Sequence, residues 1–166
     1  CDVGYYCPEA STTSTQVECP AGTFGNTQGL TTEQCSGACP RGYFCPNVTV
    51  DPFSHECAEL VLAENYENNG VVVLAVDEDE DNDAVNDIAN GAASVYCPDG
   101  SPEPVPASAG YFTTEGNPRH RTSQEVCPTG AFCVDGLQFP CPPGTYETEV
   151  GASTRCQTLC PQGTFC

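Results

Sequence analysis

The chain has 166 residues, of which 14 are cysteine and only 4 are Lys or Arg, and its formal net charge is −19. Leu, Ile, Val and Phe make up less than a fifth of it, and Trp and Met are absent. This composition excludes a large aliphatic core and, by itself, is typical of a disordered chain. The cysteines reverse that expectation, because disulfides restrict the unfolded chain and replace a core in small secreted domains.

The first stretch, residues 1–57, consists of cysteine-rich repeats. The unit at 19–45 reads CPAGTFGNTQGLTTEQCSGACPRGYFC, and residues 141–166 repeat it as CPPGTYETEVGASTRCQTLCPQGTFC. The cysteine spacing and the intervening Pro, Gly and aromatic residues agree beyond chance, which predicts an internal repeat. The glycine of each Cys-Pro-x-Gly is expected to permit a backbone turn that a side chain would hinder.

A sequon for N-linked glycosylation, Asn47-Val48-Thr49, follows the first complete unit. It predicts an N-glycan on Asn47, in a loop between cysteines that we expect to be exposed. The cysteines and the sequon both indicate an oxidising compartment, so we expect an extracellular protein, secreted or at the cell surface. The sequence has no apolar run long enough to span a membrane. Because it starts and stops on a cysteine of the repeat, we expect it to be a segment of a longer protein.

An acidic insertion, residues 58–96, interrupts the repeat between Cys57 and Cys97. The strongest aliphatic runs of the chain lie here, on either side of an Asn-Gly pair that favours a hairpin turn. We predict strands near 59–66 and 70–76, a short helix over 83–90 that ends at a glycine, and a third strand over 92–96. The insertion is therefore expected to form a small α+β or β-hairpin subdomain.

The second predicted strand of the insertion is a candidate interface for self-assembly with other copies or with neighbouring repeats. An exposed aliphatic strand pairs with another chain unless it is protected. The interface residues are Val71, Val72, Val73, Leu74 and Val76.

An alternating acidic run follows this strand and raises the question of Ca²⁺ binding, since hard cations take carboxylate oxygens. The candidate ligands are Asp77, Asp79, Asp81 and Asp83. The EF-hand pattern is not met, because Asn82 stands where that loop requires glycine. A solvated acidic loop and a weak Ca²⁺ site both remain open, and no other cofactor is expected.

Residues 97–126 contain a Pro-rich stretch, 101–106, that is expected to be an extended polyproline-like spacer. A degenerate repeat follows, in which Ala107 and Ser123 replace the two cysteines of the long loop while the other two cysteines remain. Its Arg119-His120-Arg121 run is expected to meet the acidic loop of the same chain or of a neighbour. It is not a nucleic-acid site, because the net charge would repel phosphate.

Residues 127–166 are regular cysteine-rich repeats again, and the repeats together predict the disulfides. Joint loss of two cysteines in the degenerate copy indicates that these two positions are bonded to each other in the intact copies. No Cys-x-x-Cys occurs and the chain has only 2 His, so disulfides are favoured over metal ligands. The predicted sequential pairs are Cys1–Cys7, Cys19–Cys35, Cys39–Cys45, Cys57–Cys97, Cys127–Cys133, Cys141–Cys156 and Cys160–Cys166. An interlaced pattern is the alternative for the short loops.

The motif Cys-Pro-x-Gly-Thr-aromatic followed by Cys-x3-Cys-Pro-x-Gly-aromatic-Phe-Cys resembles the ephrin-receptor-like cysteine-rich repeat. That repeat is in turn similar to part of the tumour-necrosis-factor-receptor module, and tandem arrays of it occur in large surface proteins of algae and other protists. The resemblance covers residues 1–57 and 97–166. It implies small disulfide-rich modules in tandem, mostly loop with short antiparallel β hairpins, forming an elongated rod. In the receptor modules one disulfide closes the first long loop, in agreement with Cys19–Cys35.

Two function classes follow from this reading. The first is an extracellular structural protein, a repeating block of a fibre, flagellar hair, sheath or matrix. The alternative is the ligand-binding or adhesive ectodomain of a cell-surface receptor, built from the same modules. We do not expect an enzyme, because both histidines are lone loop residues and every cysteine has a disulfide partner, which leaves no recognisable catalytic set.

Deletion of residues 59–92, with the flanks joined, should leave oxidised modules that no longer self-associate, because the aliphatic strand is the predicted contact. Sedimentation velocity of the parent and the deletion variant over a range of concentrations measures this. A variant that associates as strongly as the parent would place the interface in the repeats.

Overall fold

The computed structural model describes residues 1–58 and 94–166. Most predictions for the insertion lie outside these residues, namely the strands at 59–66 and 70–76, the helix at 83–90, the interface strand with Val71 to Val76, and the acidic run with Asp77 to Asp83. They therefore stay predictions. The third strand expected at 92–96 falls partly within the described residues, where Val95–Tyr96 is a strand.

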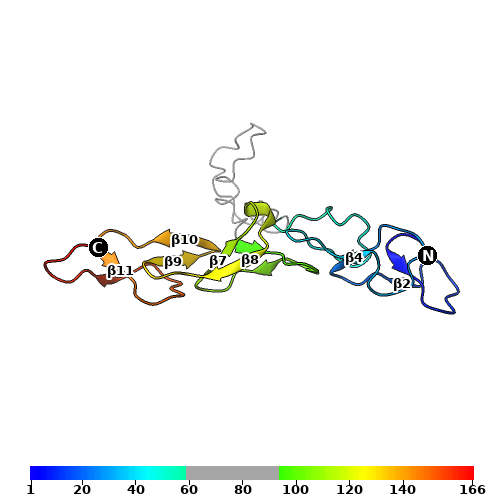
Figure 1. Cartoon of the computed structure of the whole chain (residues 1–166), viewed down its shortest axis with the longest axis horizontal. Helices are drawn as coiled ribbons and strands as arrows, with labels where there is room; N and C mark the ends of the chain where they lie inside the picture. The colour runs from blue at the N-terminus through cyan, green and yellow to red at the C-terminus, as the bar shows by residue number, and fades with distance from the viewer. Residues whose placement is uncertain (59–93) are drawn as a thin grey trace, which may run out of the picture.

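The described residues form six two-stranded antiparallel sheets and one short 3₁₀ helix. In Figure 1 the hairpins follow one another between the N- and C-termini, which stand on opposite sides of the picture. Together with the seven disulfides, they confirm the prediction of a disulfide-rich fold of loops and short hairpins. The elements are β1 Tyr5–Tyr6, β2 Val17–Glu18, β3 Thr23–Phe24, β4 Gly37–Ala38, β5 Val95–Tyr96, β6 Val105–Pro106, β7 Tyr111–Thr114, η2 Pro118–His120, β8 Ser123–Val126, β9 Ala131–Val134, β10 Leu137–Pro140, β11 Thr145–Tyr146 and β12 Thr158–Leu159.

One pairing rule recurs along the chain. The residue after each turn glycine pairs with the residue before the next Cys-Pro or its equivalent, and the glycine carbonyl accepts a hydrogen bond from that next cysteine. In the first unit Tyr5 pairs with Glu18, and the Cys19 N–H donates to the Gly4 carbonyl at 2.9 Å. The other pairs of this kind are Thr23–Ala38, Tyr43–Glu56, Tyr111–Val126, Ala131–Pro140 and Thr145–Leu159.

The turn that starts each hairpin depends on its glycine. At Gly22 φ is +85°, and the Thr23 N–H donates to the Pro20 carbonyl at 3.1 Å, which closes the turn. Residues with a side chain rarely adopt this left-handed conformation, whereas glycine does so without steric cost. A Cβ on Gly22 would also collide with the carbonyl oxygen of Gly100. The turn of one unit is therefore packed directly against the backbone of another.

All fourteen cysteines lie in the described ranges and all are paired, with Cα–Cα distances of 5.4–6.0 Å. The partners are the sequential ones, in the short loops as well as in the long ones. Disulfides also take the place of an aliphatic core. The largest fully buried side chains are Cys19, Cys39, Cys45, Cys57, Cys97, Cys127 and Cys133.

The degenerate copy replaces its missing disulfide by hydrogen bonds. Strands β7 and β8 share four residue pairs, whereas β3 and β4 of the intact copy share two. The Gln124 side chain makes two hydrogen bonds with Ser108. Its Oε1 accepts from the Ser108 N–H at 2.8 Å, and its Nε2 donates to the Ser108 hydroxyl at 3.0 Å. The Thr114 and Ser123 hydroxyls are 2.8 Å apart. Ser123, which occupies the lost cysteine position, is thus part of the strand.

The Pro-rich stretch at 101–106 is not wholly the extended spacer that its composition predicts. Its last two residues, Val105 and Pro106, form β6 and pair with β5. Proline cannot donate a backbone hydrogen bond, but it is tolerated in an edge ladder of two residues, where few donors are required. The next residue, Ala107, continues the contact, because its N–H donates to the Ser94 carbonyl at 2.7 Å.

Replacing Gly22 by Ala should destabilise the chain more than replacing Gly144 by Ala. Both glycines have nearly the same positive φ, so both variants lose about 1–2 kcal/mol for a left-handed alanine. Only at Gly22 does the new methyl group meet another unit, since a Cβ on Gly144 has no neighbour within 4 Å. That clash should add about 1–3 kcal/mol. Urea denaturation with intact disulfides measures both, and equal losses would contradict the packing between units.

Candidate functional site

The two flanks of the insertion meet at a junction that holds most of the basic residues of the chain. Here the loop Cys39–Cys45 receives the segment Cys97–Ser101 through three backbone hydrogen bonds. The Gly42 N–H donates to the Cys97 carbonyl at 2.9 Å, the Gly100 N–H to the Cys39 carbonyl at 2.8 Å, and the Cys45 N–H to the Ser101 carbonyl at 3.0 Å. The disulfide Cys57–Cys97 links the same flanks covalently. The junction is therefore fixed by backbone contacts, independently of its charges.

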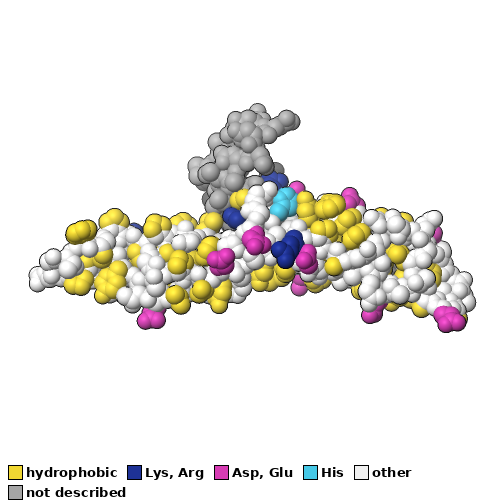
Figure 2. Space-filling view, viewed as in Figure 1, with side chains coloured by type: hydrophobic (Ala, Val, Ile, Leu, Met, Phe, Trp, Pro, Cys, Tyr) yellow, Lys and Arg dark blue, Asp and Glu magenta, His cyan; other side chains and the backbone are white. Residues whose placement is uncertain are grey.

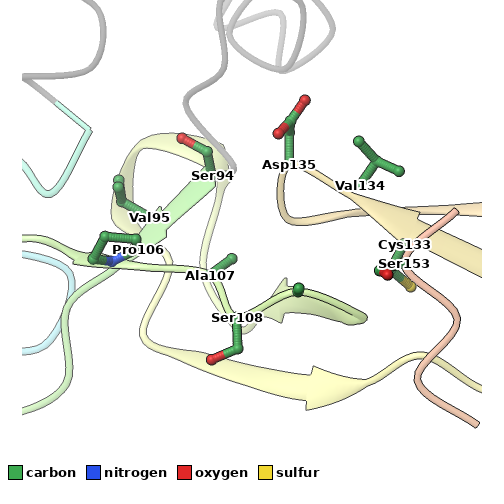
Figure 3. A pocket seen from close by; sticks show the side chains of 10 residues that line it. Ser94, Val95, Pro106, Ala107, Ser108, Cys133, Val134, Asp135 and Ser153 are labelled. Carbon is green, nitrogen blue, oxygen red and sulfur yellow. The ribbon is translucent and has the colours of Figure 1, made fainter.

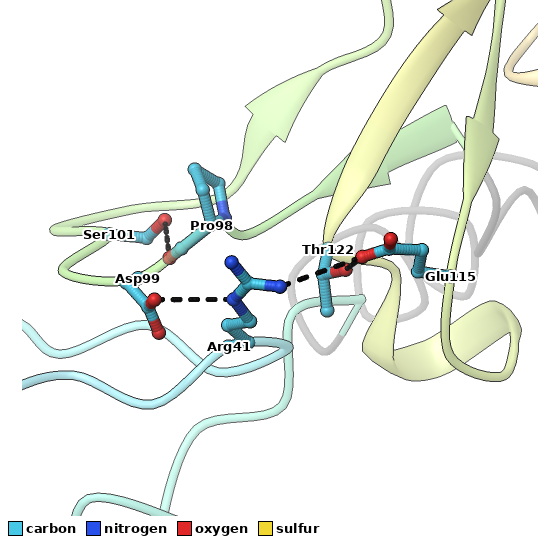
Figure 4. Close-up of polar contacts among 6 residues, drawn as sticks. All are labelled: Arg41, Pro98, Asp99, Ser101, Glu115 and Thr122. Carbon is cyan, nitrogen blue, oxygen red and sulfur yellow. Dashed lines mark hydrogen bonds and ion pairs between the residues drawn. The ribbon is translucent and has the colours of Figure 1, made fainter.

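Arg41 lies across this contact and faces two acidic residues, as Figure 4 shows. Its Nε is 3.2 Å from Asp99 Oδ2, and its Nη1 is 3.7 Å from Glu115 Oε2. The Thr122 hydroxyl also donates to Glu115 Oε2, at 2.8 Å. The side chains of Arg41 and Asp99 are 62% and 64% exposed, so water and salt screen the pair. Figure 2 shows basic and acidic side chains side by side near the middle of the molecule.

The basic run of the degenerate repeat faces Glu56. Arg119 Nη1 lies 3.6 Å from Glu56 Oε2, and His120 Nε2 lies 3.6 Å from Glu56 Oε1. Arg121 instead donates from Nη1 to the Gly116 carbonyl at 3.0 Å, and its partial burial lowers the pKa of the guanidinium. The predicted contact with the acidic loop stays a prediction, because that loop lies outside the described residues.

Both histidines make ring contacts, which corrects the prediction that they are lone loop residues. The Tyr43 ring contacts two other rings, with its centroid 5.1 Å from that of Phe53 and 4.8 Å from that of His120. The His55 ring lies 5.2 Å from that of Phe44. The contact of His120 with Tyr43 joins segments that are far apart along the chain, which single-sequence reading cannot detect.

The orientation of His120 follows from its helix cap. Asn117 precedes η2, and its Oδ1 accepts from the backbone N–H groups of Arg119 and His120. The same oxygen is 3.0 Å from His120 Nδ1. Because an amide oxygen only accepts, this contact is a hydrogen bond in the tautomer that carries a proton on Nδ1.

The predicted glycosylation site is exposed and ordered. Asn47 Oδ1 accepts a hydrogen bond from the Ala21 N–H at 2.8 Å, and the Asn47 side chain is exposed. A sugar would be attached through Nδ2, so the amide oxygen would keep this bond. Thr49 of the sequon is only 7% exposed, and its hydroxyl donates to the Pro46 carbonyl at 2.6 Å. The glycan at Asn47 stays a prediction.

A shallow pocket of about 590 Å³ lies beside the degenerate copy, where Ala107 replaces a cysteine (Figure 3). Small and apolar side chains line most of it, and Asp135 is the one ionisable residue among its described lining. Its size suits a small ligand, but it has few of the convergent polar groups that binding sites use.

The described residues hold no group of three or more His, Cys, Asp or Glu placed to bind a metal ion. The Ca²⁺ candidates Asp77, Asp79, Asp81 and Asp83 lie outside those residues and stay predictions. In the same part of the chain, no helix is long and apolar enough to cross a bilayer.

Comparison with known proteins found no matching family model, no matching curated protein and no matching solved structure. The likeness to cysteine-rich receptor repeats therefore rests on the sequence motif alone.

Sequence reasoning missed the acidic partners at this junction, Glu56, Asp99 and Glu115. One of them could have been found. Arg41 and Asp99 both occupy the third position of a Cys-Pro-x-Gly motif, so a contact between two such turns would have brought them together. No comparable signal marks Glu56 or Glu115.

Tyr43→Ala should destabilise the chain by about 2 kcal/mol or more, because it removes a half-buried ring that contacts two others. Arg41→Ala should cost less than about 1 kcal/mol, as expected for an exposed ion pair. Urea denaturation of both variants with disulfides intact measures the difference. A larger loss for Arg41→Ala would show that charge, rather than ring packing, stabilises the junction.

Proposed function

We propose that this chain is an extracellular structural protein, a repeating building block of a fibre, flagellar hair, sheath or matrix. One observation carries the proposal, namely that units of the same design are bonded to one another by the same backbone groups. The backbone N–H of the turn glycine in one unit donates a hydrogen bond to a backbone carbonyl of the next unit. The pairs are Gly4 with Gly25, Gly22 with Cys45 and Gly130 with Glu147. Units that each contact only their neighbours form an extended array rather than a single core with a binding pocket.

The proposed shape is an elongated rod of tandem disulfide-clamped modules. The order of the hairpins in Figure 1 supports it, since consecutive units contact one another along the chain. Dense disulfides support an extracellular location, because such cross-links persist in oxidising compartments. The role we propose requires neither catalysis nor a cofactor, and Ca²⁺ at the acidic run would serve only to stiffen the rod. Self-assembly and the N-glycan at Asn47 belong to the same proposal.

The second candidate is a ligand-binding or adhesive ectodomain. The pocket beside Ala107 favours it, since its volume of about 590 Å³ lies in the range of small-molecule sites. The same modules would then present a binding surface, and association between copies would not be required.

The purified, oxidised chain should appear as elongated particles in electron micrographs and should assemble further as its concentration rises. Reduction of the disulfides should abolish both, because the buried cysteines are most of the core. Negative-stain imaging of the oxidised and the reduced chain measures this. Compact, monomeric particles that bind a glycan array or a cell surface would contradict the structural role and favour the adhesive one.

A further inference from the structure

The sequon at residues 47–49 carries the acceptor of the proposed N-glycan, and its two functional groups are in opposite states. The Asn47 side chain is exposed, and its Oδ1 accepts from the Ala21 N–H at 2.8 Å. Thr49, by contrast, is 7% exposed, and its hydroxyl donates to the Pro46 carbonyl at 2.6 Å. The folded chain therefore presents the asparagine and hides the hydroxyl.

The hidden hydroxyl matters because only Ser or Thr two positions on makes an asparagine an acceptor, so the transferase must recognise that residue. In the transfer, the bond between C1 of the sugar and the diphosphate of a lipid-linked donor breaks. C1 then bonds to Asn47 Nδ2, Nδ2 gives up one proton, and the lipid diphosphate leaves. An enzyme cannot contact the Thr49 hydroxyl while that group is buried and already donates to a carbonyl.

Backbone hydrogen bonds hold the sequon in this state, because they join the segment 45–49 to the loop 19–25. The donors are the N–H groups of Gly22, Val48 and Gly25, and the acceptors are the carbonyls of Cys45, Cys19 and Thr49, at 2.8, 3.1 and 2.8 Å respectively. The disulfides Cys19–Cys35 and Cys39–Cys45 anchor the loop and the segment. Access to the hydroxyl therefore requires this contact to open, which is a local unfolding event.

The middle residue of the sequon indicates that docking imposes this conformation. Val48 has a φ of +64°, in the left-handed region that a β-branched residue rarely adopts. In an unfolded chain valine favours the extended region instead. The sequon therefore has a different backbone conformation before and after the segment 45–49 docks.

We propose that Asn47 accepts its glycan only before the segment 45–49 docks on the loop 19–25, so that sugar transfer and docking compete. The inference rests on the glycan and the extracellular location of the proposed function, and it adds the order of events. Later docking is compatible with the sugar, because the sugar attaches through Nδ2 of an exposed side chain and Oδ1 keeps its bond to Ala21. A chain that oxidises quickly therefore remains unmodified, and one that oxidises slowly carries the sugar.

The same module offers a matched control acceptor. Gln28→Thr turns residues 26–28 into the sequon Asn-Thr-Thr. Asn26, Thr27 and Gln28 are all exposed, so the new hydroxyl would lie at an exposed position rather than in a docked segment. Asn26 of this variant should accept sugar both before and after oxidation.

The test uses the full chain of the Gln28→Thr variant, a purified oligosaccharyltransferase and a lipid-linked oligosaccharide, with each asparagine followed by peptide mass spectrometry. Both should be modified in the reduced chain. In the oxidised chain Asn47 should react about 100-fold more slowly, the effect of three hydrogen bonds that must open first. The rate at Asn26 should be little changed. When the transferase is added at increasing times after oxidation begins, only the modification of Asn47 should fall.

A second variant separates the buried hydroxyl from the ordered amide. Ala21→Pro removes the N–H that donates to Asn47 Oδ1. The turn should tolerate it, because Pro143 stands at the same place in the second copy and the turn hydrogen bond is kept there, from the Thr145 N–H to the Pro142 carbonyl. Because the Thr49 hydroxyl stays buried, Asn47 of this oxidised variant should react as slowly as in the parent.

Three results would each overturn the proposal: equal rates at Asn47 in the reduced and the oxidised chain, an equal loss at Asn47 and Asn26 on oxidation, or recovery of Asn47 in oxidised Ala21→Pro. Absence of sugar on Asn47 even in the reduced chain would also overturn it. None of these results bears on the structural role, which the electron micrographs of the oxidised chain test separately.

Discussion

The backbone contact between successive Cys-Pro-x-Gly turns is the constraint on which the rest of this structure depends. At Gly22 the backbone turns with a positive φ. The Gly100 carbonyl oxygen also occupies the space that a Cβ of residue 22 would need. Glycine meets both conditions because it has no Cβ. The hydrogen bonds made there join groups that the sheets leave unpaired, and unpaired buried backbone groups are costly. Repeating this one contact allows a chain with few aliphatic residues to remain ordered.

The disulfides and the rings supply most of the stabilisation that an aliphatic core would otherwise provide. A cross-link that closes a loop of about fifteen residues contributes roughly 3 kcal/mol in the chain-entropy view, whereas an exposed ion pair contributes about 1 kcal/mol at most. At the junction, therefore, Cys57–Cys97 and the ring of Tyr43 outweigh the pairs of Arg41. The ion pairs contribute mainly to specificity, that is, to which turns contact each other, because a like charge in place of Asp99 or Arg41 would repel the partner residue.

The degenerate copy shows that the hairpin, rather than the cross-link, is the common element of the units. With Ala107 and Ser123 in place of two cysteines, the ladder of β7 and β8 lengthens, and Gln124 binds Ser108 with both ends of its amide. The turn at Gly110 and the pairing of Tyr111 with Val126 are kept. A unit can thus exchange a covalent bond for several hydrogen bonds, at the cost of leaving a shallow pocket beside Ala107.

The sequence by itself determined the elements that depend on local spacing. Fourteen cysteines in a repeated pattern, with two further cysteine positions lost together in one copy, indicated the long-loop partners, and Cys-Pro-x-Gly indicated the turns. Composition indicated loops and short hairpins in place of a core. Only the tertiary structure decided which turn lies against which, and with it the pairing of Arg41 with Asp99, the ring contact of His120 with Tyr43 and the strand at Val105–Pro106. The first two contacts join segments that are far apart along the chain, and all three depend on how the chain packs in space, which spacing along the chain does not specify.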